Sequence, residues 1–181
     1  MHPYKLFAAA LAIAAVAGAA KDAGAQQFLA RLSGFSEVGD LNNETGAILT
    51  DATATLRLFL DPRAHTAAYR LSYSSGFTST VTQAHIHFGK NHVPGGILVF
   101  LCTNLGNGPA GTPACPAAPA TVTGTLTAAN ILAIPGENVA AGNFGALENA
   151  LFFNTAYINI HTAQFPLGEV RGQIYPVGTQ P

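Results

Sequence analysis

The sequence predicts an all-β domain with one or two short helices, folded as an antiparallel β-sandwich or barrel. Strand-like segments recur roughly every ten residues, and clusters of Gly, Pro and Asn separate them. Only 9% of the 181 residues are charged. Abundant Ala, Thr and Gly suit a β surface built from small and hydroxyl side chains rather than from ion pairs. The length fits one domain with a real core.

Alternating polar and apolar residues mark most of the strands. We predict strands over residues 28–33, 52–60, 67–73, 81–88, 96–102, 121–126, 157–162 and 169–175. Short helices are predicted over 127–132 and 143–153, because Thr127 and Asn143 are suitable N-cap residues. The segment 97–101 is apolar on both faces, which predicts a strand in the middle of the protein.

The first 25 residues have the parts of a signal peptide. Lys5 precedes an apolar run over 6–20, and the small residues Ala23-Gly24-Ala25 stand before Gln26. A membrane anchor is the other interpretation, but this run is shorter than the roughly 20 residues that a span requires. We therefore predict a signal peptide over 1–25 and a single soluble domain over 26–181, secreted or periplasmic, with no membrane span after cleavage.

The charge balance argues against two classes of partner. From Gln26 onward the chain has six basic and eight acidic residues. Nucleic acids and anionic membranes are bound by a concentration of basic residues. The sequence therefore predicts no nucleic-acid partner.

Cys102 and Cys115 are the two cysteines of the chain, and they flank a Gly- and Pro-rich segment. Behind a signal peptide they are expected to form a disulfide that closes this loop. Free thiols and a metal-thiolate pair are the alternatives, but the spacing fits no zinc-ligand pattern.

Histidines provide the main candidate site. In the strand 81–88, His85 and His87 share one face while Ala84 and Ile86 share the other, because side chains alternate along a strand. In 157–162 the same rule places Tyr157, Asn159 and His161 together on the polar face.

Two imidazoles spaced two residues apart on a strand are a recurring metal-ligand arrangement, and His161, His92 or Glu169 would supply the third ligand. The other interpretation is a structural polar cluster, in which the imidazoles bond to carbonyl groups and to Glu169. Glu169 and Arg171 also share a strand face with Gln173. We interpret Glu169 and Arg171 as an ion pair rather than as a catalytic couple.

Motifs of common enzymes are missing from the sequence. We find no nucleophile elbow, zinc-protease helix or phosphate-binding loop, so the sequence favours a protein that is not an enzyme. A hydrolase in which a Ser or Thr pairs with a histidine is the alternative. Asn43-Glu44-Thr45 has the form of a glycosylation acceptor.

Six short segments spread over the chain are its most distinctive feature: Leu32-Ser33-Gly34, Glu37-Val38, Thr45-Gly46, and residues 84–89, 157–162 and 165–173. Together they resemble the chordin-type (CHRD) domain family. The sequence differs from the family pattern at Gly39-Asp40, where the family usually has two prolines. The resemblance implies an immunoglobulin-like β-sandwich or barrel and a binding or structural role. The family is named after repeats in chordin, an extracellular antagonist of growth-factor signalling, but growth-factor binding does not transfer to an isolated domain.

Two hypotheses for the function follow. The first is a secreted, non-catalytic module that needs no cofactor and binds an extracellular protein, a glycan or a second copy of itself. The second is a copper or zinc protein that uses His85, His87 and His161. The paired-histidine strand faintly resembles that of copper/zinc superoxide dismutases, although the fourth histidine and bridging aspartate of those enzymes have no match.

Overall fold

The computed structural model describes residues 25–38 and 46–178. Most of the predicted signal peptide, the Gly39-Asp40 departure and the Asn43-Glu44-Thr45 acceptor lie outside these residues. The strands are β1 (Gln26–Ser33), β2 (Thr53–Asp61), β3 (Thr66–Tyr73), β4 (Val81–Phe88), β5 (Gly96–Thr103), β6 (Ala120–Leu126), β7 (Ala156–Thr162), β8 (Val170–Gln173) and β9 (Tyr175–Pro176). The helices are α1 (Phe144–Phe152) and the 3₁₀ turns η1 (Gly34–Ser36), η2 (Ala128–Asn130) and η3 (Pro135–Glu137).

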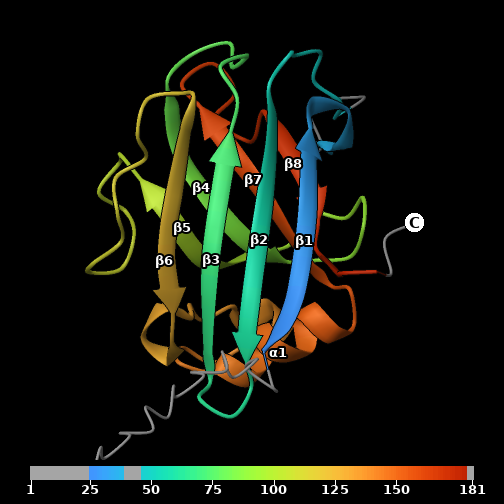
Figure 1. Cartoon of the computed structure of the whole chain (residues 1–181), viewed down its shortest axis with the longest axis vertical. Helices are drawn as coiled ribbons and strands as arrows, with labels where there is room; N and C mark the ends of the chain where they lie inside the picture. The colour runs from blue at the N-terminus through green and yellow to red at the C-terminus, as the bar shows by residue number, and fades with distance from the viewer. Residues whose placement is uncertain (1–24, 39–45, 179–181) are drawn as a thin grey trace, which may run out of the picture.

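All the strands belong to one antiparallel sheet that curls into a nearly closed barrel, as the sequence predicts. The order is β5-β4-β7-β8-β1-β2-β3-β6, and β9 adds to β1. Figure 1 shows the two halves of this sheet as layers, with β6, β3, β2 and β1 in front and β5, β4, β7 and β8 behind. The consecutive strands β1, β2 and β3 are neighbours in the sheet, and so are β4 and β5. Each of these pairs is antiparallel, as in a hairpin.

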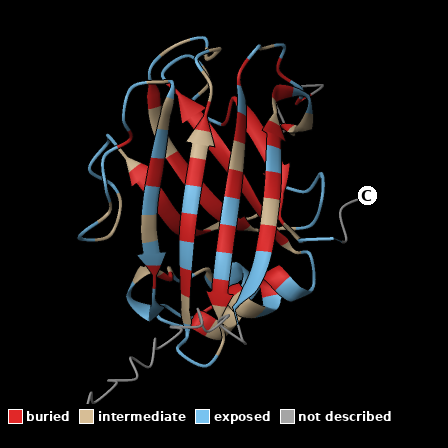
Figure 2. Cartoon of the chain, viewed as in Figure 1, coloured by how far each residue is buried: buried red, intermediate tan, exposed pale blue. Residues whose placement is uncertain are grey.

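The front half of the barrel has one buried face and one exposed face. Along β2, Ala54, Leu56, Leu58 and Leu60 are buried, and the residues between them point outward. Figure 2 shows this alternation as bands along the front strands, whereas the strands behind are buried almost continuously. The back half is therefore covered on both faces, and this difference positions the candidate site.

One α-helix closes the lower end of the barrel in Figure 1. The predicted helix over 143–153 is present as α1, and its apolar stripe of Phe144, Leu147, Ala150 and Leu151 is buried. The helix predicted over 127–132 is only the 3₁₀ turn η2. At its start, the backbone N–H and the hydroxyl of Thr127 both donate to the side-chain oxygen of Asn130. Within the described ranges, no helix has both the length and the apolar character needed to span a bilayer.

The predicted burial of the apolar strand over 97–101 is confirmed, because residues 98–101 of β5 are buried on both faces and Ile97 is half-buried. In the sheet order, β5 stands at one end. The other end is β6. Tyr69 from β3 spans the gap between these two strands: its ring lies over Gly124 of β6, and its hydroxyl donates to the Leu101 carbonyl of β5 at 2.8 Å. A side chain at position 124 would collide with that ring.

The predicted disulfide is present between Cys102 and Cys115, with Cα atoms 5.0 Å apart. Asn104 ties the same loop to the barrel, because its side-chain amide donates to the carbonyls of Val81 and Cys115. The backbone N–H of Thr103 also donates to the Pro113 carbonyl. The loop after β5 is therefore fixed by covalent and hydrogen bonds together.

Replacing both cysteines with alanine is expected to lower the free energy of unfolding by about 3 kcal/mol, because the unfolded chain regains the entropy of an open loop. Urea unfolding of the double variant, compared with the oxidised parent, measures this loss. An unchanged midpoint would mean that Asn104 and its neighbours alone hold the loop.

Candidate functional site

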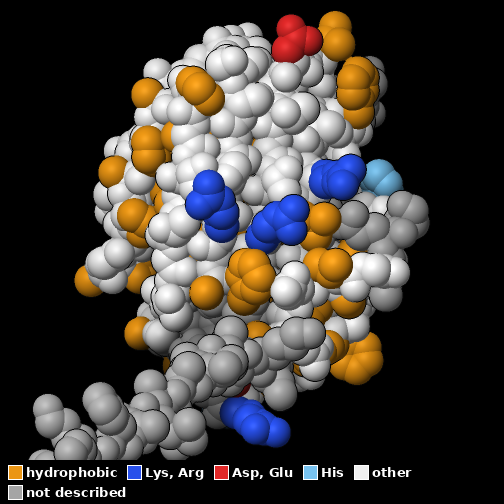
Figure 3. Space-filling model, in the orientation of Figure 1, with side chains coloured by type: hydrophobic (Ala, Val, Ile, Leu, Met, Phe, Trp, Pro, Cys, Tyr) orange, Lys and Arg blue, Asp and Glu red, His pale blue; other side chains and the backbone are white. Residues whose placement is uncertain are grey.

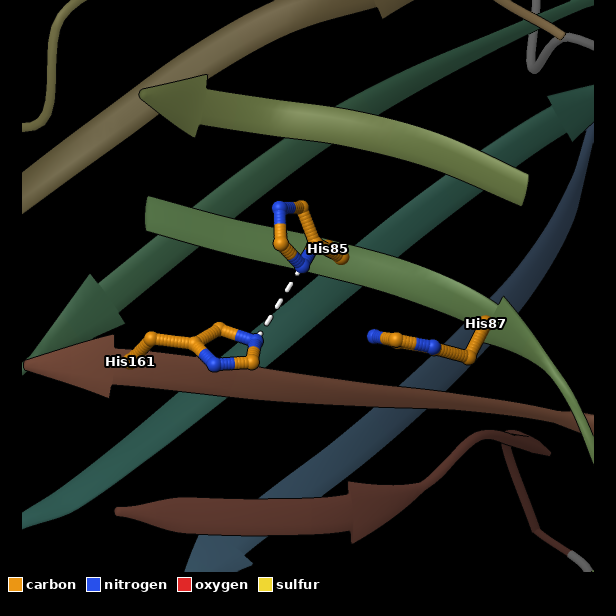
Figure 4. A group of neighbouring side chains, drawn as sticks. All are labelled: His85, His87 and His161. Atoms are coloured by element: carbon orange, nitrogen blue, oxygen red, sulfur yellow. Dashed lines mark hydrogen bonds between the residues drawn. The ribbon is translucent and has the colours of Figure 1, made fainter. Parts of the chain in front are cut away.

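The candidate site lies on the outside of the back half of the barrel, where β4 and β7 pair. His85 and His87 point outward from β4, while Ala84 and Ile86 point into the core. The antiparallel register places Asn159 of β7 opposite His85. His161 lies two residues after Asn159 in β7, opposite Gln83. Alternation and register together bring the three imidazole rings to one place, as Figure 4 shows.

These outward side chains are nevertheless buried. His85, His87 and His161 are only 1%, 7% and 5% exposed. Phe100 of β5 packs against the His85 ring, with the ring centres 4.3 Å apart. The connections 89–95 and 163–169 supply backbone carbonyls that contact the other two rings. The cluster is thus enclosed between a strand surface and the loops at its ends.

Backbone carbonyls fix the protonation of two of the rings. Nδ1 of His87 lies 2.9 Å from the Gly95 carbonyl, and Nδ1 of His161 lies 2.9 Å from the Pro166 carbonyl. A carbonyl oxygen only accepts, so each Nδ1 carries the proton. In the neutral rings each Nε2 then carries a lone pair. Metal-binding histidines in proteins usually have this arrangement, with the second nitrogen bonded to a carbonyl or carboxylate.

The nitrogen atoms converge. Nδ1 of His85 lies 3.1 Å from Nε2 of His161, which also lies 2.9 Å from the side-chain oxygen of Asn159. Nε2 of His87 is buried without a hydrogen-bond partner, and Figure 4 shows its ring directed toward the other two. One ring nitrogen from each histidine lies within 4.8 Å of the others. Since Nε2 of His161 only accepts, Nδ1 of His85 donates to it, and Nε2 of His85, like that of His87, is buried without a partner. A cation in place of the shared proton would be held by nitrogen lone pairs of all three rings.

Burial keeps the rings neutral. Burial, with smaller contributions from the neighbouring His161 and His87, lowers the pKa of His85 to about 2. Burial also lowers the pKa of His87 to about 4, although the bond to the Gly95 carbonyl opposes this change. The pKa of His161 is lowered for the same main reason. At neutral pH, protons therefore do not compete for these nitrogens.

A stack of side chains supports His87 from the side. The ring of Tyr157 lies parallel to that of His87, at 4.7 Å, and the guanidinium of Arg171 lies 3.4 Å from the centre of the Tyr157 ring. Arg171 donates to the carbonyls of Lys90 and Val93. The Tyr157 hydroxyl accepts from the N–H of Gly95. The stack therefore anchors the connection 89–95, whose Gly95 carbonyl orients His87.

Gly95 makes this approach possible. A Cβ atom there would collide with the carbonyl oxygen of Phe88. Only glycine lets the chain pass close enough for its carbonyl to reach the His87 ring.

The structure separates other residues that the sequence suggested together. Glu169 is fully buried, but its carboxylate accepts hydrogen bonds from Thr50, Thr78 and Thr162 rather than from a histidine. Glu169 and Arg171 form no ion pair among the described residues, so that interpretation is wrong. His92 lies exposed on the connection 89–95. Of the three candidates for a third ligand, only His161 adjoins His85 and His87.

Sequence reasoning missed Phe100, which covers His85, and Glu37, which is 6% exposed. Burial raises the pKa of Glu37 to about 7, while the nearby Arg171 lowers it. The carbonyls of Gly95 and Pro166 carry no side-chain signal that could have revealed them. For Phe100, the register between β4 and β5 was the missing information.

The fold and the cluster define a small antiparallel β-barrel module with a disulfide, which fits an oxidising compartment. The family model for the CHRD domain matches residues 28–174. The chain belongs to the CHRD domain family. No curated protein and no solved structure matches it.

Proposed function

We propose that this CHRD domain is an exported, non-catalytic binding module whose ligand at the histidine cluster is a copper or zinc ion. The observation that carries the proposal is the pair of carbonyl bonds on Nδ1 of His87 and His161, which leave Nε2 of each ring unprotonated in a buried space. Nε2 of His87 has no hydrogen-bond partner there, and Nε2 of His161 lies 3.1 Å from Nδ1 of His85. Neutral imidazole nitrogen is a preferred ligand of both metals. Export is supported by the features of the first 25 residues and by the disulfide.

The size of the cluster is compatible with one ion after a small closure. Zinc–nitrogen bonds are about 2.0–2.1 Å long, so two nitrogens on a tetrahedral ion lie roughly 3.4 Å apart. The present separations reach 4.8 Å. Side-chain rotations that move the nitrogens by roughly 1 Å would bring them to bonding distance, and the side-chain oxygen of Asn159, 2.9 Å from Nε2 of His161, would supply a fourth ligand.

Burial favours holding an ion over turning over a substrate. The three rings are enclosed by Phe100, Tyr157 and the two connections, so a bound ion would have little contact with other molecules. Within the described part of the chain, the group of potential metal ligands comprises these three histidines alone. A dismutase-like reaction would need an accessible metal, and this favours the non-catalytic function.

The test uses the chain that begins at Gln26, so that His2 is absent. After treatment with chelator, the protein is dialysed separately against Zn²⁺ and Cu²⁺, and the metal is measured by elemental analysis. We expect one ion per chain. An ion held at a hundred times its dissociation constant should also raise the free energy of unfolding by about 2.7 kcal/mol.

Substitutions locate the ion. His87→Gln and His161→Gln should each abolish most of the binding, whereas the matched control His92→Gln, on the exposed connection, should retain it. Circular dichroism verifies that each variant is folded. A metal content near zero in the parent protein would reject the proposal, as would equal binding by all the variants.

A further inference from the structure

A second surface, on the opposite side of the barrel, carries most of the exposed basic residues that the structure describes. Arg31 of β1, Arg57 of β2 and Arg70 of β3 point outward from three neighbouring strands, and all three are exposed. We call the surface formed by these residues the arginine face. Figure 3, which views this side, shows Lys and Arg side chains in a band across the middle of the sheet.

The register places these charges next to each other. Arg57 is directly opposite Arg70, and Arg31 is opposite Thr55, two residues away from Arg57. Like charges directly opposite each other on neighbouring strands destabilise a sheet. None of the three arginines forms an ion pair with a described residue. The fold therefore maintains a cluster of positive charge that no side chain in the described ranges neutralises.

The rest of the arginine face is uncharged and rich in hydroxyl groups. The outward residues around the arginines include Thr53, Thr55, Ser72, Thr121 and Thr123. The nearest acidic side chain on these strands, Asp61 at the end of β2, accepts instead from the backbone of its own turn. A hollow of about 540 Å³ lies between Arg31 and Arg57 and is lined by several of these hydroxyl side chains.

An aromatic ring completes the surface. Phe59 points outward from β2, two residues from Arg57, and is 38% exposed. A partly exposed apolar ring beside hydroxyl groups and arginines suits a flat ligand that has apolar faces, many hydroxyl groups and negative charge. Arginine pairs with carboxylates through two parallel hydrogen bonds.

We propose that the arginine face binds an acidic polysaccharide, with carboxylates of successive sugar units on the arginines and a sugar ring against Phe59. Neighbouring strands are about 4.8 Å apart, so a chain that crosses the strands meets charged groups at short intervals. A nucleic acid fits less well, because the chain as a whole has a net charge of −1 and lacks the wide basic field that such ligands require.

The test measures binding of alginate, a polymer of uronic acids, to the chain from Gln26, with neutral dextran as the negative control. The buffer contains chelator and little salt. We expect binding to alginate and none to dextran. Affinity should fall as salt is added, because exposed charges are screened.

Substitutions map the contact. Arg57→Gln and Arg70→Gln should each weaken alginate binding by about tenfold, as expected for the loss of a charge-assisted hydrogen bond. Both should fold, since each removes a like-charge contact. Arg63→Gln, an exposed arginine in the turn after β2, is the matched control and should bind as the parent does. His87→Gln should also bind normally, so that this result is independent of the metal site.

Three results would overturn the proposal. These are the absence of alginate binding, an equal loss in the Arg63→Gln control, and equally tight binding of polyglutamate, which would identify an acidic peptide as the partner instead. Phe59→Ala separates charge from shape: it should weaken alginate binding without changing its dependence on salt.

Discussion

Replacing Glu169 with alanine is expected to lower the free energy of unfolding by roughly 3–5 kcal/mol, because four hydrogen bonds to a fully buried carboxylate are lost at once. The carboxylate accepts from the hydroxyls of Thr50, Thr78 and Thr162 and from the N–H of Thr78, at 2.7 to 2.9 Å. Thr50 precedes β2, Thr78 precedes β4 and Thr162 ends β7. One buried side chain thus ties together three segments that are distant in sequence.

Urea unfolding of the variant and its parent at pH 7 measures the effect. Thr162→Val removes one of the donors and should cost roughly 1–2 kcal/mol. The matched control is Glu148→Gln, which replaces the surface carboxylate 3.1 Å from Nδ1 of exposed His65 with an uncharged amide and should cost less than about 1 kcal/mol. Equal losses for Glu169→Ala and Glu148→Gln would show that the threonine network contributes nothing special.

Much of the barrel and of the candidate site could be predicted because alternation is a local property of a strand. The predicted strand over 157–162 matches β7 closely. Alternation along this strand correctly places Asn159 and His161 on the face opposite Ile158 and Ile160. The same rule correctly orients His85 and His87. Local pattern was sufficient to predict which faces are polar.

Alternation could not predict where a strand begins, nor could it predict that backbone carbonyls are the hydrogen-bond partners of the histidines. If the alternation of β8 extended back from Arg171, Glu169 would lie on the same face as the histidine cluster. However, β8 begins only at Val170. Gly168, with a φ of 133°, turns the chain just before it, so the Glu169 carboxylate meets the threonines instead. Nor does local alternation indicate that β5 ends the sheet, since this depends on which strands pair.

Acidification from pH 7 to pH 5 is expected to weaken the metal-free protein by roughly 2–3 kcal/mol. The folded-state pKa values of His85 and His87 lie far below the ordinary value of 6.5, mainly through burial. Below pH 6.5 the unfolded chain binds protons that the folded chain does not, so stability falls as the pH falls. Each of these two rings accounts for roughly 2 kcal/mol over this interval. His161 acts in the same direction.

Glu37 opposes this trend over the same interval. Burial raises its pKa from 4.5 to about 7. The folded state therefore takes up a proton as the pH falls toward 5, while the unfolded chain stays largely ionised. This uptake stabilises the fold by roughly 2 kcal/mol, which offsets about one histidine. The effect of the other histidine remains, and His161 adds to it, so the net effect of acid is destabilising.

Urea unfolding at pH 5, 6, 7 and 8 in the presence of chelator checks both contributions. His87→Gln should reduce the loss between pH 7 and pH 5 by roughly 2 kcal/mol, and Glu37→Gln should increase it by a similar amount. His92→Gln, whose ring is exposed, should leave the profile unchanged. Stability that is constant or rises as the pH falls would show that the imidazoles take up protons in the folded state. The lone pairs on which metal binding depends would then not be free.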